Sequence, residues 1–243
     1  LSHGRSLDKV SQAESIEYYP RLSRDLAKLT VSQYWADLIL YQTPSHEPNL
    51  ALFDLICQRL TDLVRCDSGI PVLIHLVYGI AQLLNLAGVK PHLEHCCLSG
   101  QPVCAETIGS GRVVFSPNAG GVVLPTEAIE DKGRLNGPHV QERSAIYRQG
   151  VISRRGAGKT TLTLSASELT IMQRLFQFQD LTSLTHTCPL ELLMLTDAAP
   201  EWLRIEQVLR SYVQYHTERF IRSAALLDSC FPSPSVAVSA LHP

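Results

Sequence analysis

The chain has 243 residues, of which 45% are hydrophobic and 18% charged, and its formal net charge is −2 at pH 7. This composition is that of an ordinary globular protein with enough apolar residues for one large domain or two small ones. Because the charge is nearly balanced, no general positive field attracts nucleic acid, and any such binding depends on local basic patches.

The seven cysteines are an odd number with no regular spacing, and two of them, Cys96 and Cys97, are adjacent. This pattern favours a reducing compartment over a secreted disulfide framework. The sequence opens with Leu-Ser-His-Gly-Arg, which is no secretion signal and lacks a starting Met. We therefore expect a fragment of a longer protein.

In chain order, residues 6–19 suggest the last strand of a preceding β domain, closed by Pro20. A helix is predicted over 22–41, with Ser23 or Asp25 as its cap. Its apolar stripe consists of Leu22, Leu26, Leu29, Tyr34, Leu38 and Tyr41.

Pro48 is predicted to open a second helix that continues to Val64. Its inward side chains are expected to be Leu52, Phe53, Ile56, Leu60 and Leu63. The third helix, 70–89, is long enough to cross a bilayer, but its polar residues His75, Gln82 and Asn85 share one face. A buried helix of a helical bundle, ended by Gly88 and Pro91, is the better interpretation.

The middle of the chain changes character, since 96–123 is rich in Gly, Ser, Pro and short β-branched runs. The run Phe115-Ser-Pro-Asn-Ala-Gly-Gly-Val-Val123 predicts a hairpin, with a turn at Ser-Pro-Asn and two glycines for tight folding. Residues 127–159 are polar and glycine-rich, which is typical of a mobile excursion.

The sequence Ser165-Ala-Ser-Glu168 is a capping box that predicts a helix through Phe178. Pro200 is predicted to start the last long helix, from 203 to 227, before a disordered tail after Phe231. On that helix one apolar face is expected from Ile205, Leu209, Val213, Phe220 and Leu227, with His216 as a packed structural histidine at its edge.

The stretch Ser153-Arg-Arg-Gly-Ala-Gly-Lys-Thr160 is close to a phosphate-binding loop, which would make the chain an ATP- or GTP-binding protein. Ser153 replaces the first glycine, however, and Thr161-Leu-Thr-Leu164 alternates like a strand where a helix should begin. We expect an exposed turn, or a basic loop in which Arg154, Arg155 and Lys159 touch DNA phosphate.

Five possible metal ligands cluster in the middle of the chain: His92, His95, Cys96, Cys97 and Cys104. Paired ligands at knuckle spacing are absent, so buried free thiols are the expectation and no metal is predicted.

The last predicted helix carries Arg204, Tyr215, Arg219 and Arg222 along one flank. Arginines interleaved with an aromatic ring suit a phosphate or carboxylate beside a base or an apolar group, although a solvated flank has the same pattern. No set of nucleophile, base and orienting acid is present, so we predict no catalytic residues.

Five segments in this order and spacing resemble the RecO family of recombination mediators. They are Leu1–Glu14, Leu22–Leu40, Leu84–Pro91 with Cys96, Phe115–Val123, and Leu209–Tyr212 continuing to His216 and Ser223. The resemblance implies a mainly α (α+β) fold. Residues 1–19 would be the end of an OB-fold, 20–231 a helical bundle with a β/loop insertion at about 92–160, and 232–243 a disordered tail.

The resemblance also implies a DNA repair protein of the RecF pathway that acts in the cytoplasm and nucleoid. It implies no enzymatic activity, no cofactor and no membrane partner. Such a protein binds single- and double-stranded DNA, anneals strands and, with RecR, helps load RecA onto DNA coated by single-strand-binding protein. Arg154, Arg155, Lys159, Arg219 and Arg222 would contact DNA. Alternatively, the flank with Arg204 and Tyr215 would receive the acidic tail of the single-strand-binding protein. A helical adaptor that binds no DNA is a further alternative.

Zinc-binding members of that family place four cysteines around the hairpin. This chain has Cys96 at the first of those positions, but Ser99, Leu124 and Glu127 at the others. The resemblance therefore predicts a degenerate, metal-free zinc knuckle that is held by side-chain packing.

Overall fold

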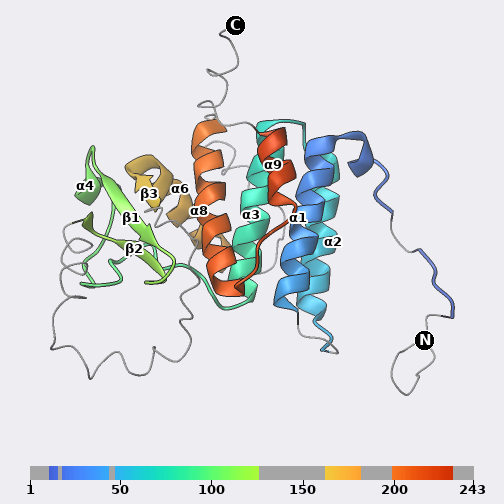
Figure 1. The fold of residues 1–243 in the computed structure, drawn as a ribbon, viewed down its shortest axis with the longest axis horizontal. Helices are drawn as coiled ribbons and strands as arrows, with labels where there is room; N and C mark the ends of the chain where they lie inside the picture. The colour runs from blue at the N-terminus through green and yellow to red at the C-terminus, as the bar shows by residue number, and fades with distance from the viewer. Residues whose placement is uncertain (1–10, 16–17, 44–46, 126–161, 182–198, 232–243) are drawn as a thin grey trace, which may run out of the picture.

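The computed structural model describes residues 11–15, 18–43, 47–125, 162–181 and 199–231. Helices dominate it, with one small sheet (Figure 1). The helical elements are η1 (Leu22–Arg24), α1 (Leu26–Gln42), α2 (Leu50–Arg65), α3 (Ile70–Leu86), α4 (Ala105–Ile108), α6 (Ala166–Leu181), α8 (Ala199–Thr217) and α9 (Ala224–Cys230). The strands are β1 (Arg112–Ser116), β2 (Gly121–Val123) and β3 (Leu162–Ser165).

Helix α3 lies at the centre of the bundle, where α1, α2, α6 and α8 pack around it (Figure 1). All residues from Val72 to Ala81 are buried, which confirms the predicted buried helix. Among the described helices, none combines the length and apolarity that crossing a bilayer requires. The chain runs in the same direction along α1, α3 and α8, so their C-terminal ends meet at one end of the bundle.

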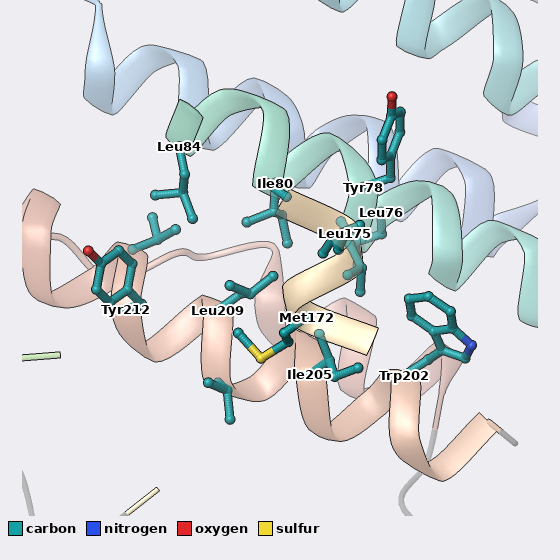
Figure 2. Close-up of a cluster of buried hydrophobic side chains, with 14 of the residues drawn as sticks. Leu76, Tyr78, Ile80, Leu84, Met172, Leu175, Trp202, Ile205, Leu209 and Tyr212 are labelled. Carbon is teal, nitrogen blue, oxygen red and sulfur yellow. The ribbon is translucent and has the colours of Figure 1, made fainter. Parts of the chain in front are cut away.

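The core between α3, α6 and α8 is filled by large apolar side chains, among them Leu76, Met172, Trp202 and Leu209 (Figure 2). On the other side of α3, the ring of Trp35 packs against Gly79. A Cβ atom at Gly79 would lie 2.5 Å from the Trp35 Nε1 atom. This glycine therefore makes room for an indole in the core.

Short polar side chains cap the N-terminal ends of α1 and α2. Asp25 caps α1 by accepting from the backbone N–H groups of Ala27 and Lys28, and Asn49 caps α2 by accepting from Leu52. The predicted starts at Leu22 and Pro48 are therefore too early. Two predicted inward side chains, Leu26 and Phe53, are instead 67% and 63% exposed.

The sheet has the order β2-β1-β3, and both neighbouring pairs are antiparallel. Its β1–β2 hairpin confirms the predicted turn, in which Gly120 has a left-handed φ of 83°. The backbone of His92 crosses directly over Gly121, where an added Cβ atom would lie 2.0 Å from the His92 carbonyl oxygen. The second glycine therefore lets the loop 91–103 dock on the hairpin.

The capping box that precedes α6 is formed as predicted. The Ser165 hydroxyl accepts from the Glu168 N–H at 3.2 Å, and the Glu168 carboxylate accepts from the Ser165 N–H at 2.7 Å. Strand β3 runs directly into this cap, so a helix begins only at Ala166.

The single helix predicted over 203–227 is wrong. Helix α8 ends at Thr217, Glu218 adopts a left-handed φ of 52°, and the chain turns before α9 begins at Ala224. The turn buries Ile221, whereas Phe220, a predicted inward residue, is 71% exposed.

At the other end of the chain, residues 11–15 and 18–19 form neither helix nor strand, so the described part of the segment 6–19 lacks the expected strand. The excursion at 127–159 and the tail from 232 lie outside the described residues.

Candidate nucleic-acid and partner interface

The basic loop residues Arg154, Arg155 and Lys159 lie outside the described residues, and so does the glycine-rich stretch 156–160. The residues after it are described, and they form strand β3 rather than a helix. This agrees with the alternation seen in the sequence, and the first described helix after the stretch begins only at Ala166.

Arg204 is only partly exposed, unlike Tyr215, Arg219 and Arg222. Its guanidinium donates to the Thr163 carbonyl oxygen at 3.3 Å and to the Gln207 side chain at 3.4 Å. Arg204 and Tyr215 are eleven residues apart on α8, roughly 16 Å along the helix axis. Arg204 therefore ties α8 to the edge of β3.

Tyr215 instead joins α8 to the hairpin turn. Its hydroxyl and the Asn118 Oδ1 atom are 2.7 Å apart, and its ring meets that of His216 edge-on. The His216 ring also meets Tyr212 edge-on at 4.3 Å. Partial burial lowers the pKa of His216, so it is mostly neutral near pH 7. This packing supports a structural role for His216.

Arg219 and Arg222 lie on the turn between α8 and α9 rather than on a helix flank, and both are exposed. The Arg219 guanidinium carbon is 5.9 Å from the centre of the Tyr41 ring, and the Tyr41 hydroxyl donates to the Phe220 carbonyl oxygen. The structure therefore brings Arg219 of the turn to the Tyr41 ring of α1, with exposed Phe220 and Arg222 on the same turn.

Beside this turn is a cavity of about 270 Å³ between the C-terminal ends of α1, α3 and α8. Its lining residues are Tyr41, Leu84, Ala87, Val89, Val213, His216 and Thr217. Tyr41 is shared between the cavity and the Arg219 contact. We call Tyr41, Arg219, Phe220, Arg222 and this cavity the end site.

The sequence interpretation missed Tyr41 and Phe220 as members of the end site, because both were assigned to apolar helix faces. Periodicity gave no signal here, because the apolar spacing of the predicted helix continues past Thr217.

Comparison with known proteins identifies the chain. Residues 23–130 match the family model described as "Recombination protein O C terminal". A "DNA repair protein RecO" from Acaryochloris marina is 40% identical over 240 residues, which cover 97% of this chain and 78% of that protein. A protein of the same name from Nostoc punctiforme is 36% identical over 95% of this chain and 77% of its own length. The chain belongs to the RecO family. No solved structure matches it.

Within this RecO-family chain, a second and larger cavity of about 700 Å³ lies between loop 91–103 and α6. Its walls include the segment Lys90–Cys97, Ala119 from the hairpin, and Gln173, Phe176 and Gln177 from α6. The cavity marks where the β/loop insertion joins the bundle.

The five candidate ligands His92, His95, Cys96, Cys97 and Cys104 all lie in this insertion. Across the described ranges, no three His, Cys, Asp or Glu residues gather closely enough to hold a metal ion. Burial raises the pKa of the Cys97 thiol, which disfavours the thiolate that a metal needs. Leu124 does lie beside Cys96, as the resemblance to a zinc knuckle implies.

Proposed function

We propose that this chain acts as a recombination mediator that binds DNA and partner proteins without catalysing a reaction. The proposal rests on membership of the RecO family and on the composition of the end site. Mediation would include annealing complementary strands and, with RecR, loading RecA onto DNA coated by single-strand-binding protein. Its place of action would be the cytoplasm and nucleoid.

The end site supports a role for it in partner binding. Exposed arginines on the turn beside a cavity whose lining includes Leu84, Val89 and Val213 suit an acidic peptide that ends in an aromatic residue, since a guanidinium binds the carboxylate and the cavity takes the ring. Arg219 beside the Tyr41 ring is the observation that carries this assignment. We therefore assign the end site to the tail of the single-strand-binding protein.

DNA contact is assigned to the basic loop with Arg154, Arg155 and Lys159. Its three cations fall within six residues, as a local patch on a nearly neutral chain requires. The alternative for the end site is that Arg219 and Arg222 contact DNA instead of the tail of the single-strand-binding protein.

Charge reversal tests the end site. In the double variant Arg219→Glu/Arg222→Glu, we expect the affinity for a labelled tail peptide to fall at least about tenfold in a fluorescence titration, because two charge-assisted contacts become repulsive. The matched control is Arg24→Glu/Arg65→Glu, which makes the same charge change at exposed positions at the opposite end of the bundle.

A labelled single-stranded oligonucleotide in the same titration separates the two assignments. Unchanged peptide affinity would remove the tail assignment. A loss confined to the oligonucleotide would assign Arg219 and Arg222 to DNA.

A further inference from the structure

The zinc ligands that the family resemblance implies do not fit the side chains in this insertion. Cys96 is 2% exposed, and its sulfur accepts a hydrogen bond from the Leu124 N–H at 3.4 Å. Ser99 accepts from the Gln101 N–H, and Leu124 has no ligand atom in its side chain. Glu127 lies outside the described residues. Some other interaction must therefore hold this part of the fold.

Loop 91–103 folds into two arms that pair with each other. The Val103 N–H donates to the Glu94 carbonyl oxygen, and the Cys96 N–H donates to that of Gln101, both at 2.8 Å. The first arm also pairs with the hairpin. The His92 N–H donates to the Gly120 carbonyl oxygen, and the Val122 N–H donates to the His92 carbonyl oxygen, both at 2.9 Å. These bonds shape the loop and attach it to the sheet. They do not attach it to the helices.

The shortest hydrogen bonds between the loop and the helices come from Gln173 of α6. Its Nε2 atom donates to the Leu93 carbonyl oxygen at 2.8 Å and to the Val103 carbonyl oxygen at 2.9 Å. Leu93 and Val103 are 4% and 2% exposed and lie on opposite arms. A single amide nitrogen therefore uses both hydrogens to join the two arms to each other and to the bundle.

We propose that Gln173, together with the buried Cys96 thiol, takes the place of a metal ion in this insertion. Glutamine suits this position because its NH₂ group is a neutral double donor, whereas a carboxylate or thioether of similar size offers no hydrogen to either carbonyl group. Without the donor, two buried carbonyl groups lose their partner, which is costlier than losing an exposed hydrogen bond.

The variant Gln173→Met keeps the length of the side chain and removes both hydrogen bonds. We expect its unfolding midpoint to fall by several degrees, and hydrogen exchange at the amides of Val103 and Cys96 to quicken at least about tenfold. The control is Gln177→Met, one turn along α6, where the side chain is exposed and its amide makes a 3.4 Å contact with Glu94. This control should leave both measurements nearly unchanged.

Metal analysis of the wild-type chain is an independent test, because it does not require the variant to fold. The purified wild-type chain should hold far less than one zinc per molecule, and a strong chelator should not shift its unfolding midpoint. One tightly bound zinc per chain whose removal lowers the midpoint would overturn the proposal. Unchanged exchange in Gln173→Met would overturn it as well. If Gln173→Met does not fold while Gln177→Met does, the proposed attachment is supported.

Discussion

His75 is a titratable residue in the core of the bundle, on the most buried helix. Burial, together with the positive charges of Arg59 on α2 and Lys28 on α1, lowers its pKa from 6.5 to about 4. Arg59 is itself buried, donates to Asp62 at 2.8 Å and lies 5.0 Å from the centre of the Tyr78 ring. A proton on His75 would therefore add a further positive charge to a site that already holds two.

This environment makes acid stability depend on His75. Because its folded-state pKa lies below that of the unfolded chain, the unfolded state binds more protons at acidic pH. Stability should fall as the pH drops from 6.5 to about 4, by about 3 kcal/mol from this residue. In His75→Gln that part of the pH dependence should disappear, as measured by urea unfolding at several pH values.

The control for this prediction is His95→Gln, at an exposed histidine, which should keep the wild-type pH dependence. If wild type and His75→Gln lose stability equally on acidification, His75 does not carry the effect.

At the scale of elements, α9 is attached to the bundle by polar contacts at both of its ends. Asp37 on α1 accepts from the Ser223 N–H and hydroxyl, at 3.1 and 2.8 Å. Arg210 on α8 donates to buried Glu206 at 2.6 Å and to half-exposed Asp228 of α9 at 2.7 Å. Burial raises the pKa of Glu206, so this carboxylate needs Arg210 beside it to remain charged.

The two partners of Arg210 should therefore contribute unequally to stability. Arg210→Met leaves Glu206 as an unpaired buried acid and should cost about 3 kcal/mol. Asp228→Asn removes a partner whose side chain is 60% exposed and should cost less than about 1 kcal/mol. Urea unfolding of both variants measures the difference. Equal losses would show that the buried pair is no more important than the exposed one.

At the scale of the whole molecule, the net charge of −2 means that attraction to DNA depends on where the basic residues lie. Since counterion release scales with the number of phosphates neutralised, the salt dependence of binding reports how many cations touch the backbone.

Replacing Arg154, Arg155 and Lys159 with alanine should reduce the magnitude of the slope of log affinity against log salt by about 2 for single-stranded DNA. Fluorescence anisotropy at several salt concentrations measures this slope. The matched control replaces three exposed arginines near the start of α1 and the end of α2, namely Arg21, Arg24 and Arg65. A slope that the loop substitutions leave unchanged would discard the loop as a DNA contact.

Local signals in the sequence were sufficient for much of the fold. The capping box at Ser165, the turn before Gly120 and the apolar run of α3 each depend on residues close together in the chain, and all three are confirmed. The family too could be recognised from short motifs in order, since their spacing is a property of the chain alone.

Only the tertiary structure decided what lies at the end of the bundle and around loop 91–103. The apolar spacing of 203–227 continues past Thr217, so periodicity alone cannot reveal that α9 turns back to meet Asp37 and Arg210. Gln173 likewise has no local signature, because its partners Leu93 and Val103 are 80 and 70 residues away in the chain. Helix caps and turns are set by neighbours in sequence, whereas contacts between elements depend on how the folded chain packs.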